Sequence, residues 1–185
     1  MLLLYVPERL RCAPQSSMAG IDPRHVASNR HVQADGSVLI LGPSIRFRIA
    51  TLKPGYVLMT CSGGRSNHPD DAQAELGMLH ELDLELKRAG ALTVFADLRH
   101  ASRMTAESRE VASTWMRENR ERLRGSHVLV GSKLLEMAMS IVGMLVGGGI
   151  LKVYSQPRAF LDIVRGAAPD LVELPSLAAT SATGS

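Results

Sequence analysis

An alternation of short apolar strands with helices over residues 91–165 constrains the fold of this chain more than any other feature. The stretches 91–97, 127–131 and 150–155 are apolar at most of their positions, which is typical of parallel strands that are covered on both faces. A segment with helical character follows each stretch. The sequence therefore predicts an α/β protein with helices on both sides of its sheet.

Three further strands are predicted before this region, over residues 37–41, 45–52 and 56–61. Two short segments that contain Pro and Gly separate them, as is typical of tight turns. In the second strand, apolar residues alternate with Arg46 and Arg48, so we expect both arginines on a solvated face. The expected sheet is mixed, with a three-stranded N-terminal part followed by alternating helices and strands.

Four helices are predicted, over residues 70–89, 105–123, 133–147 and 157–165. The first carries a leucine stripe and ends at Lys87 and Arg88, which suit the negative end of the helix dipole. The second alternates arginine with glutamate on its outer face, where Glu118 and Arg122 are spaced for an ion pair. The third is apolar almost all round and therefore needs cover on most of its faces.

The length and the patterning indicate one domain with two tails. A chain of 185 residues that is 45% hydrophobic can bury one sizeable core. We expect this domain over residues 36–166. Residues 1–35 show no sustained periodicity and are expected to form a partly disordered extension, and residues 167–185, rich in Ala, Ser and Thr, are expected to be a disordered tail.

Composition restricts the classes of partner. The net charge of +3 comes from arginines that are interspersed with acidic residues, and the chain has only three Phe, three Tyr and one Trp. Neither a basic stripe nor a base-stacking platform is indicated, so nucleic acid is not expected as a partner. The longest apolar run, 134–151, contains a glutamate and a glycine triplet, so stable membrane insertion is not expected either.

The sequence contains no complete catalytic or metal-binding motif. The six histidines are not spaced for zinc, and the loop 61–68 lacks the glycine pattern of a phosphate-binding loop. Cys61 and His68 are a conceivable nucleophile and base, but Cys61 ends an apolar strand and is better read as a buried, inert thiol. We therefore expect no enzymatic activity, no catalytic residue, no cofactor and no metal. Two widely separated cysteines fit a reducing cytoplasm.

The order of the predicted elements and several local segments resemble a SpoIIAA-like domain. The segments that carry the resemblance are 95–99, 107–124, 128–132, 134–146, and 151–155 leading into 159–161. The SpoIIAA-like class contains STAS domains and is grouped with CRAL-TRIO lipid-transfer modules. The resemblance implies a single STAS-like domain that acts as a non-enzymatic regulatory or interaction module. The phosphorylated Asp-Ser-Ser-Gly turn of some STAS proteins is replaced here by Met104-Thr105-Ala106-Glu107, where Thr105 is expected to cap a helix.

The carboxyl ends of the predicted strands suggest where a protein partner docks. Binding sites of open α/β sheets lie outside these ends, which directs attention to the loop that follows Asp97 and to the arginines of the next helix. The residues predicted to bind a partner are Asp97, Arg99, Arg103, Thr105, Arg109 and Arg117. An equally strong alternative makes Asp97 a structural carboxylate that accepts hydrogen bonds from loop N–H groups.

The apolar helix over residues 133–147 suggests a second interaction face. Its candidate covers are a second copy of the chain, which we favour, an apolar ligand, a membrane surface, or the N-terminal segment. The residues predicted to form this face are Met137, Ser140, Ile141, Met144 and Val146. Two functions follow: a regulatory module that docks a protein or forms a homodimer, and alternatively a carrier or sensor of a lipid-like or other apolar small ligand.

Overall fold

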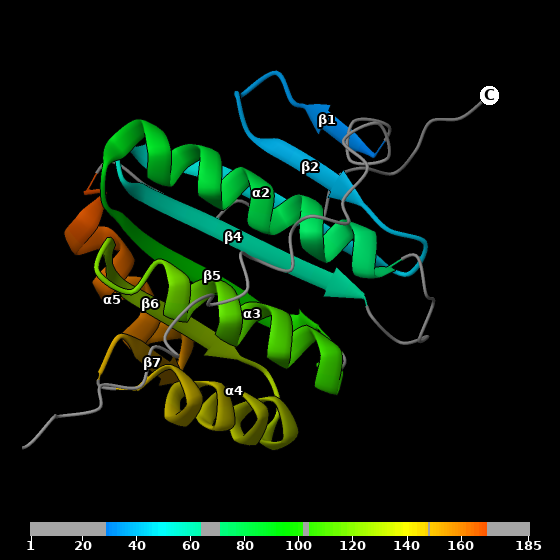
Figure 1. The fold of residues 1–185 in the computed structure, drawn as a ribbon. Coiled ribbons are helices and arrows are strands. Elements are labelled where there is room, and N and C mark those ends of the chain that lie inside the picture. The colour runs from blue at the N-terminus through cyan, green and yellow to red at the C-terminus, as the bar shows by residue number, and fades with distance from the viewer. Residues whose placement is uncertain (1–28, 64–70, 102–103, 148, 170–185) are drawn as a thin grey trace, which may run out of the picture.

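The structure, a computed structural model, describes residues 29–63, 71–101, 104–147 and 149–169. Within these residues the chain forms a seven-stranded mixed sheet and four helices, which confirms the predicted α/β class (Figure 1). The strands stand in the sheet in their sequence order, from β1 to β7. The first four pair antiparallel, and β4 to β7 pair parallel.

The antiparallel half contains the three predicted strands and one that the sequence pattern did not predict. The predicted strands are β2 (Val38–Leu41), β3 (Ile45–Lys53) and β4 (Tyr56–Gly63). The additional strand, β1 (Arg30–Val32), falls in the predicted N-terminal extension. Its three residues are too few to show a periodicity, and a two-pronged ion pair from Arg30 to Glu81 of helix α2 (Asp71–Ala89) fastens it.

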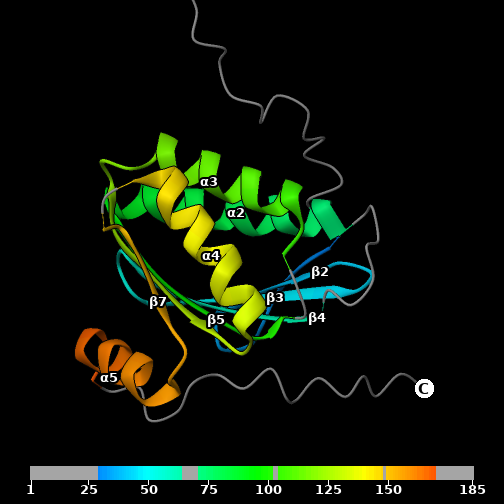
Figure 2. The same ribbon diagram turned by 90° about the horizontal axis from the view of Figure 1, so that it is seen from below.

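The parallel half repeats a strand-to-helix unit that always advances in the same direction across the sheet. Right-handed crossovers in such an order put their helices on one face, and Figure 2 shows α2, α3 and α4 together on that face. Helix α5 lies on the opposite face, so helices cover both sides, as predicted, but unequally. The elements after α2 are β5 (Leu92–Ala101), α3 (Ala106–Glu118), β6 (Leu123–Val130), α4 (Lys133–Val146), β7 (Leu151–Tyr154) and α5 (Pro157–Ala167).

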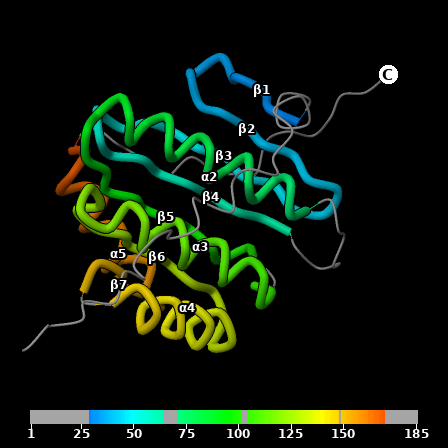
Figure 3. The backbone as a smooth tube through the Cα atoms, viewed as in Figure 1, coloured from blue at the N-terminus to red at the C-terminus, as the bar shows by residue number. Residues whose placement is uncertain are grey.

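Two apolar clusters hold these layers together. The larger lies between the sheet and helices α2, α3 and α4, and the backbone view in Figure 3 shows α2 and α3 running along the sheet. The smaller lies under α5 and consists of Leu58, Phe95, Leu129, Phe160 and Val164. Among the described residues, no helix is long and apolar enough to cross a membrane.

Helix α3 ends five residues before its predicted end. Asn119 is the C-cap, and its side-chain amide donates to the carbonyl of Trp115 at 2.9 Å. Leu123 then begins β6, four residues before the predicted start of that strand. The predicted ion pair between Glu118 and Arg122 needs a continuous helix, but Arg122 lies beyond the end of α3 and donates to the carbonyl of Leu86 at 2.7 Å.

We predict that Phe160→Ala lowers the free energy of unfolding by about 3–5 kcal/mol, the usual cost of truncating a buried aromatic side chain. Phe160 is fully buried and anchors α5 against the sheet. Ile163→Ala, on the same helix at a residue that is 42% exposed, is the control and should cost less than about 1 kcal/mol. Urea denaturation of both variants measures the difference, and equal losses would contradict the packing of α5 described above.

Candidate functional site

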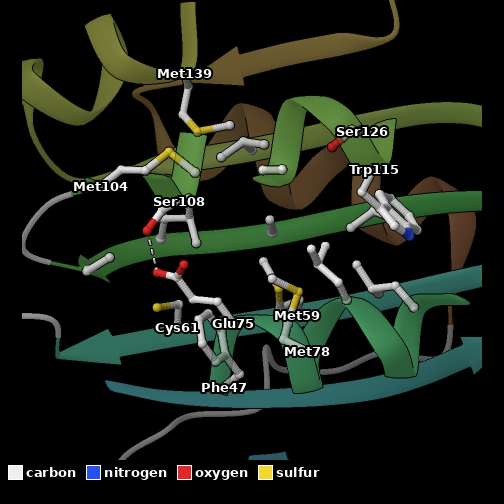
Figure 4. A pocket seen from close by; sticks show the side chains of 18 of the residues that line it. Phe47, Met59, Cys61, Glu75, Met78, Met104, Ser108, Trp115, Ser126 and Met139 are labelled. Atoms are coloured by element: carbon white, nitrogen blue, oxygen red, sulfur yellow. Dashed lines mark hydrogen bonds between the residues drawn. The ribbon is translucent and has the colours of Figure 1, made fainter. Parts of the chain in front are cut away.

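An apolar cavity lies between the sheet and its three-helix face. It has a volume of about 120 Å³, is partly open to the surface, and is lined by side chains from four strands and three helices (Figure 4). Five methionines line it: Met59, Met78, Met104, Met116 and Met139. Methionine is flexible and polarizable, so a surface rich in it adapts to apolar molecules of different shape. This chemistry suits a non-polar guest.

Small side chains line the cavity both from the sheet and from α3. Ala96 on β5 lies in the floor, and Ser108 and Ala112 of α3 line the wall above it. Protein interiors are normally packed to the density of organic crystals, and larger residues at these positions would occupy the volume. The local sequence therefore forms good secondary structure here but leaves space between the layers.

The Glu75 carboxylate and the Ser108 hydroxyl line the polar end of the cavity, and the Thr105 hydroxyl contacts Ser108. The Ser108 hydroxyl of α3 donates to Oε1 of Glu75 on α2 at 2.6 Å, and this bond links the two helices (Figure 4). The Thr105 and Ser108 hydroxyl oxygens are 2.8 Å apart. Burial raises the pKa of Glu75 although the Ser108 hydrogen bond opposes the shift, and the charges of Asp71 and Glu107 raise it further.

Cys61 also lines the cavity and is buried, as the sequence predicted. Burial, with the negative charges of Glu75, Asp97 and Asp71, raises the pKa of its thiol to about 12. The thiol is therefore protonated at neutral pH and is a poor nucleophile. His68, the base considered with it, lies outside the described residues.

Trp115 closes another part of the cavity wall. Its indole Nε1 is buried and has no hydrogen-bond acceptor within the part of the chain that the structure describes, which is uncommon because buried donors are nearly always paired. Trp115 is the single tryptophan of the chain. Its fluorescence therefore reports on this cavity alone.

Two of the predicted partner-binding residues, Asp97 and Arg99, are paired with each other on β5. Two nitrogens of the Arg99 guanidinium donate to the Asp97 carboxylate, the shorter contact being 2.7 Å, and the Arg99 backbone N–H donates to it as well. Asp97 is only 5% exposed. This geometry matches the structural alternative, in which the Asp97 carboxylate accepts bonds from its own loop.

The other described members of the predicted docking set belong to α3. Thr105 caps this helix as predicted, because its hydroxyl oxygen accepts from the Ser108 N–H at 3.0 Å. Arg109 is half-buried and Arg117 is exposed. Asp97 shares the strand parity of Phe95, which packs under α5, so it faces away from α3. The Arg99 guanidinium lies against the Asp97 carboxylate. The structure thus does not bring the described members onto one surface, and Arg103 lies outside the described residues.

Helix α4 carries the apolar face that the sequence predicted, with one correction. Met137, Ile141 and Met144 are exposed large apolar residues, and Ser140 is exposed beside them. Val146 is only 3% exposed and belongs to the core. The sequence of a helix that is apolar on all sides does not indicate which side is buried. The residues of α4 that the structure buries are Leu135, Ala138, Met139, Val142 and Val146.

The sequence analysis did not find Glu75, Ser108 or the lining methionines as site residues. Each looks like ordinary helix or strand packing along the chain, and only their convergence from distant elements makes a site. Within the described ranges, no group of three or more His, Cys, Asp or Glu residues is arranged to hold a metal ion. No protein-family model matches the chain, and a comparison with curated proteins finds no match.

We predict that Arg99→Met lowers the free energy of unfolding by about 2 kcal/mol, because it leaves the buried Asp97 carboxylate without its cation. Adding Asp97→Asn to this variant should restore part of the loss, since the unpaired charge is then removed. Arg117→Met, at an exposed arginine on α3, should change stability by less than about 0.5 kcal/mol. Urea denaturation of the four proteins provides the comparison. A loss for Arg99→Met no larger than for Arg117→Met would contradict the structural role.

Proposed function

We propose that this domain is a carrier or sensor of a small apolar molecule, which it binds without catalysing a reaction in the cavity under α2, α3 and α4. The single observation that supports this proposal is the partly open, methionine-lined volume of about 120 Å³. At about 24 cal/mol per Å³, unfilled core volume of that size costs about 3 kcal/mol. A ligand of matching shape offsets this cost, so binding and stability are coupled.

The volume indicates the size of the bound group. An engineered apolar cavity of about 150 Å³ binds benzene, so a cavity of about 120 Å³ accommodates roughly six carbon atoms. Because the cavity is partly open, a longer chain can place its remaining carbons outside it. The lining methionines adjust to rings and chains alike.

We also infer that the domain is SpoIIAA-like. The support is the element order, in which antiparallel strands, a helix and then successive strand and helix units build one sheet in sequence order. One fold class can bind many different partners, because the binding residues lie in loops and between layers and not in the framework of the fold. The cavity, and not the class, decides which molecule is bound.

We predict that 1-hexanol changes the fluorescence of Trp115 in a saturable way and raises the melting temperature of the full chain. Ala112→Leu, which adds three carbons to the cavity wall, should weaken this binding at least tenfold. Ala106→Leu is the matched control, since Ala106 is exposed on the same helix and does not line the cavity, and its affinity should equal that of the parent.

Native mass spectrometry of the purified parent protein provides an independent check of the same function. We expect a co-purified small molecule in the parent and its loss in Ala112→Leu. Absence of a bound molecule, together with no response of Trp115 to 1-hexanol, would refute the proposal. Equal affinity of the two leucine variants would move the binding site away from this cavity.

A second function, self-association through α4, is supported by the exposed stripe on that helix. Its members are Leu134, Met137, Ile141, Met144 and Leu145, and the first four are spaced alternately three and four residues apart, as in the seam of paired helices. They are exposed by 40–74% each, so together they form an apolar stripe that suits the centre of an interface, the part that is most apolar. We propose a second copy as the occupant, since one self-complementary stripe suffices for a two-fold dimer.

We predict that the parent chain sediments as a dimer at micromolar concentration and that Met144→Glu converts it to a monomer. Met144 is 74% exposed within one chain, so the new charge disrupts the interface without unfolding the domain, and circular dichroism should remain unchanged. Ala159→Glu adds the same side chain at an exposed residue of α5 and should leave the dimer intact. A monomeric parent in analytical ultracentrifugation would refute self-association.

A further inference from the structure

The Ser108 hydroxyl, which lines the polar end of the cavity, and the Thr105 hydroxyl, which contacts it, form a relay with a defined direction. Ser108 gives its only hydroxyl proton to Glu75, so the close contact between the two hydroxyls requires Thr105 to donate to Ser108. Thr105 is free to do so, because its oxygen accepts the Ser108 N–H as the helix cap. The relay therefore runs from Thr105 through Ser108 to Glu75 and ends in an acceptor.

Glu75 retains capacity to accept further hydrogen bonds. An ionised carboxylate accepts about four, and the described contacts of Glu75 use one, from Ser108 to Oε1. The remaining polar lining groups are Ser126, the protonated thiol of Cys61 and the indole Nε1–H of Trp115. Figure 4 shows the Glu75 carboxylate between the Ser108 hydroxyl and the Cys61 sulfur. The polar atom of a ligand at this end of the cavity therefore lies next to the Glu75 carboxylate oxygens, which accept hydrogen bonds.

The charges that the described residues place around this end are negative. The charges that shift the pKa of Glu75 belong to Asp71 and Glu107, and both raise it. The residues that line the cavity include no Arg, Lys or His among those the structure describes. Arg109, one residue beyond Ser108, does not line the cavity and donates to the backbone carbonyl of Met104 at 3.4 Å. An anionic group placed here meets like charge.

We propose, on the basis of the apolar-ligand function above, that the cavity selects ligands whose polar end donates a hydrogen bond, an alcohol or a protonated amine, and rejects carboxylates of the same carbon skeleton. The donor of the ligand bonds to Glu75 while the carbon skeleton lies among the methionines. A carboxylate ligand has only hydrogen-bond acceptors, and the relay also ends in an acceptor, Glu75, so the two cannot form a hydrogen bond. The negative charges around Glu75 also repel the charge of the ligand.

The test compares three probes with the same six-carbon chain: 1-hexanol, hexylammonium and hexanoate. Each is titrated at pH 7 into the full-length protein, with Trp115 fluorescence as the readout. We expect 1-hexanol and hexylammonium to bind at least tenfold more tightly than hexanoate. Glu75→Gln keeps an oxygen that can accept from Ser108 but removes the negative charge. It should therefore reduce the ratio of the affinities for hexylammonium and hexanoate at least tenfold. The affinity for 1-hexanol should change by less than about threefold.

Glu110→Gln is the matched control, because Glu110 is exposed on α3 and does not line the cavity, and it should leave all three affinities unchanged. Equal binding of the three probes, or tightest binding of hexanoate, would overturn this selectivity while the apolar-ligand function stands. An unchanged difference in affinity between hexylammonium and hexanoate in Glu75→Gln would also overturn the selectivity, since Glu75 then does not select the ligand. Failure of all three probes to bind would overturn the function and the selectivity together.

Discussion

The parallel pairing of β4, β5, β6 and β7 in strict sequence order is the constraint on which the rest of this structure depends. Each crossover advances the sheet by one strand in the same direction, so the connecting helices α2, α3 and α4 lie on a single face. One face of the sheet then carries a layer of three helices, and the opposite face carries α5. The cavity lies between this layer and the sheet, and the exposed stripe of α4 lies on the outside of the layer.

Asp97 and Glu75 are two acidic residues that differ in how their charges are compensated. Asp97 is buried, and its charge is matched by Arg99 two residues away on the same strand. Glu75 is also largely removed from water, but its described partner is the neutral hydroxyl of Ser108. A buried charge with a built-in cation needs no further ligand. A carboxylate with only a hydroxyl has interaction capacity left, and it lies where a ligand can use it.

The sequence predicted the fold class, most strand positions and the Thr105 cap because each depends on a pattern of a few neighbouring residues. It did not predict β1, whose attachment depends on Glu81, 51 residues from Arg30. It placed Val146 on the wrong face because an apolar helix carries no internal mark of its buried side. The cavity was beyond prediction for a related reason, since a lining methionine and a core methionine are the same residue until the opposing walls are placed.

The proposed self-association and the proposed ligand binding both involve α4. Its inner stripe includes Leu135 and Met139, which line the cavity, while its outer stripe includes Met137 and Met144, which are exposed. A helix packed on both stripes has less freedom to move away from the sheet than a helix packed on one. Occupancy of the cavity and pairing of the outer stripe would therefore restrain the same element, so each event lowers the entropic cost of the other. In a dimer built through α4, ligand affinity would then increase with protein concentration.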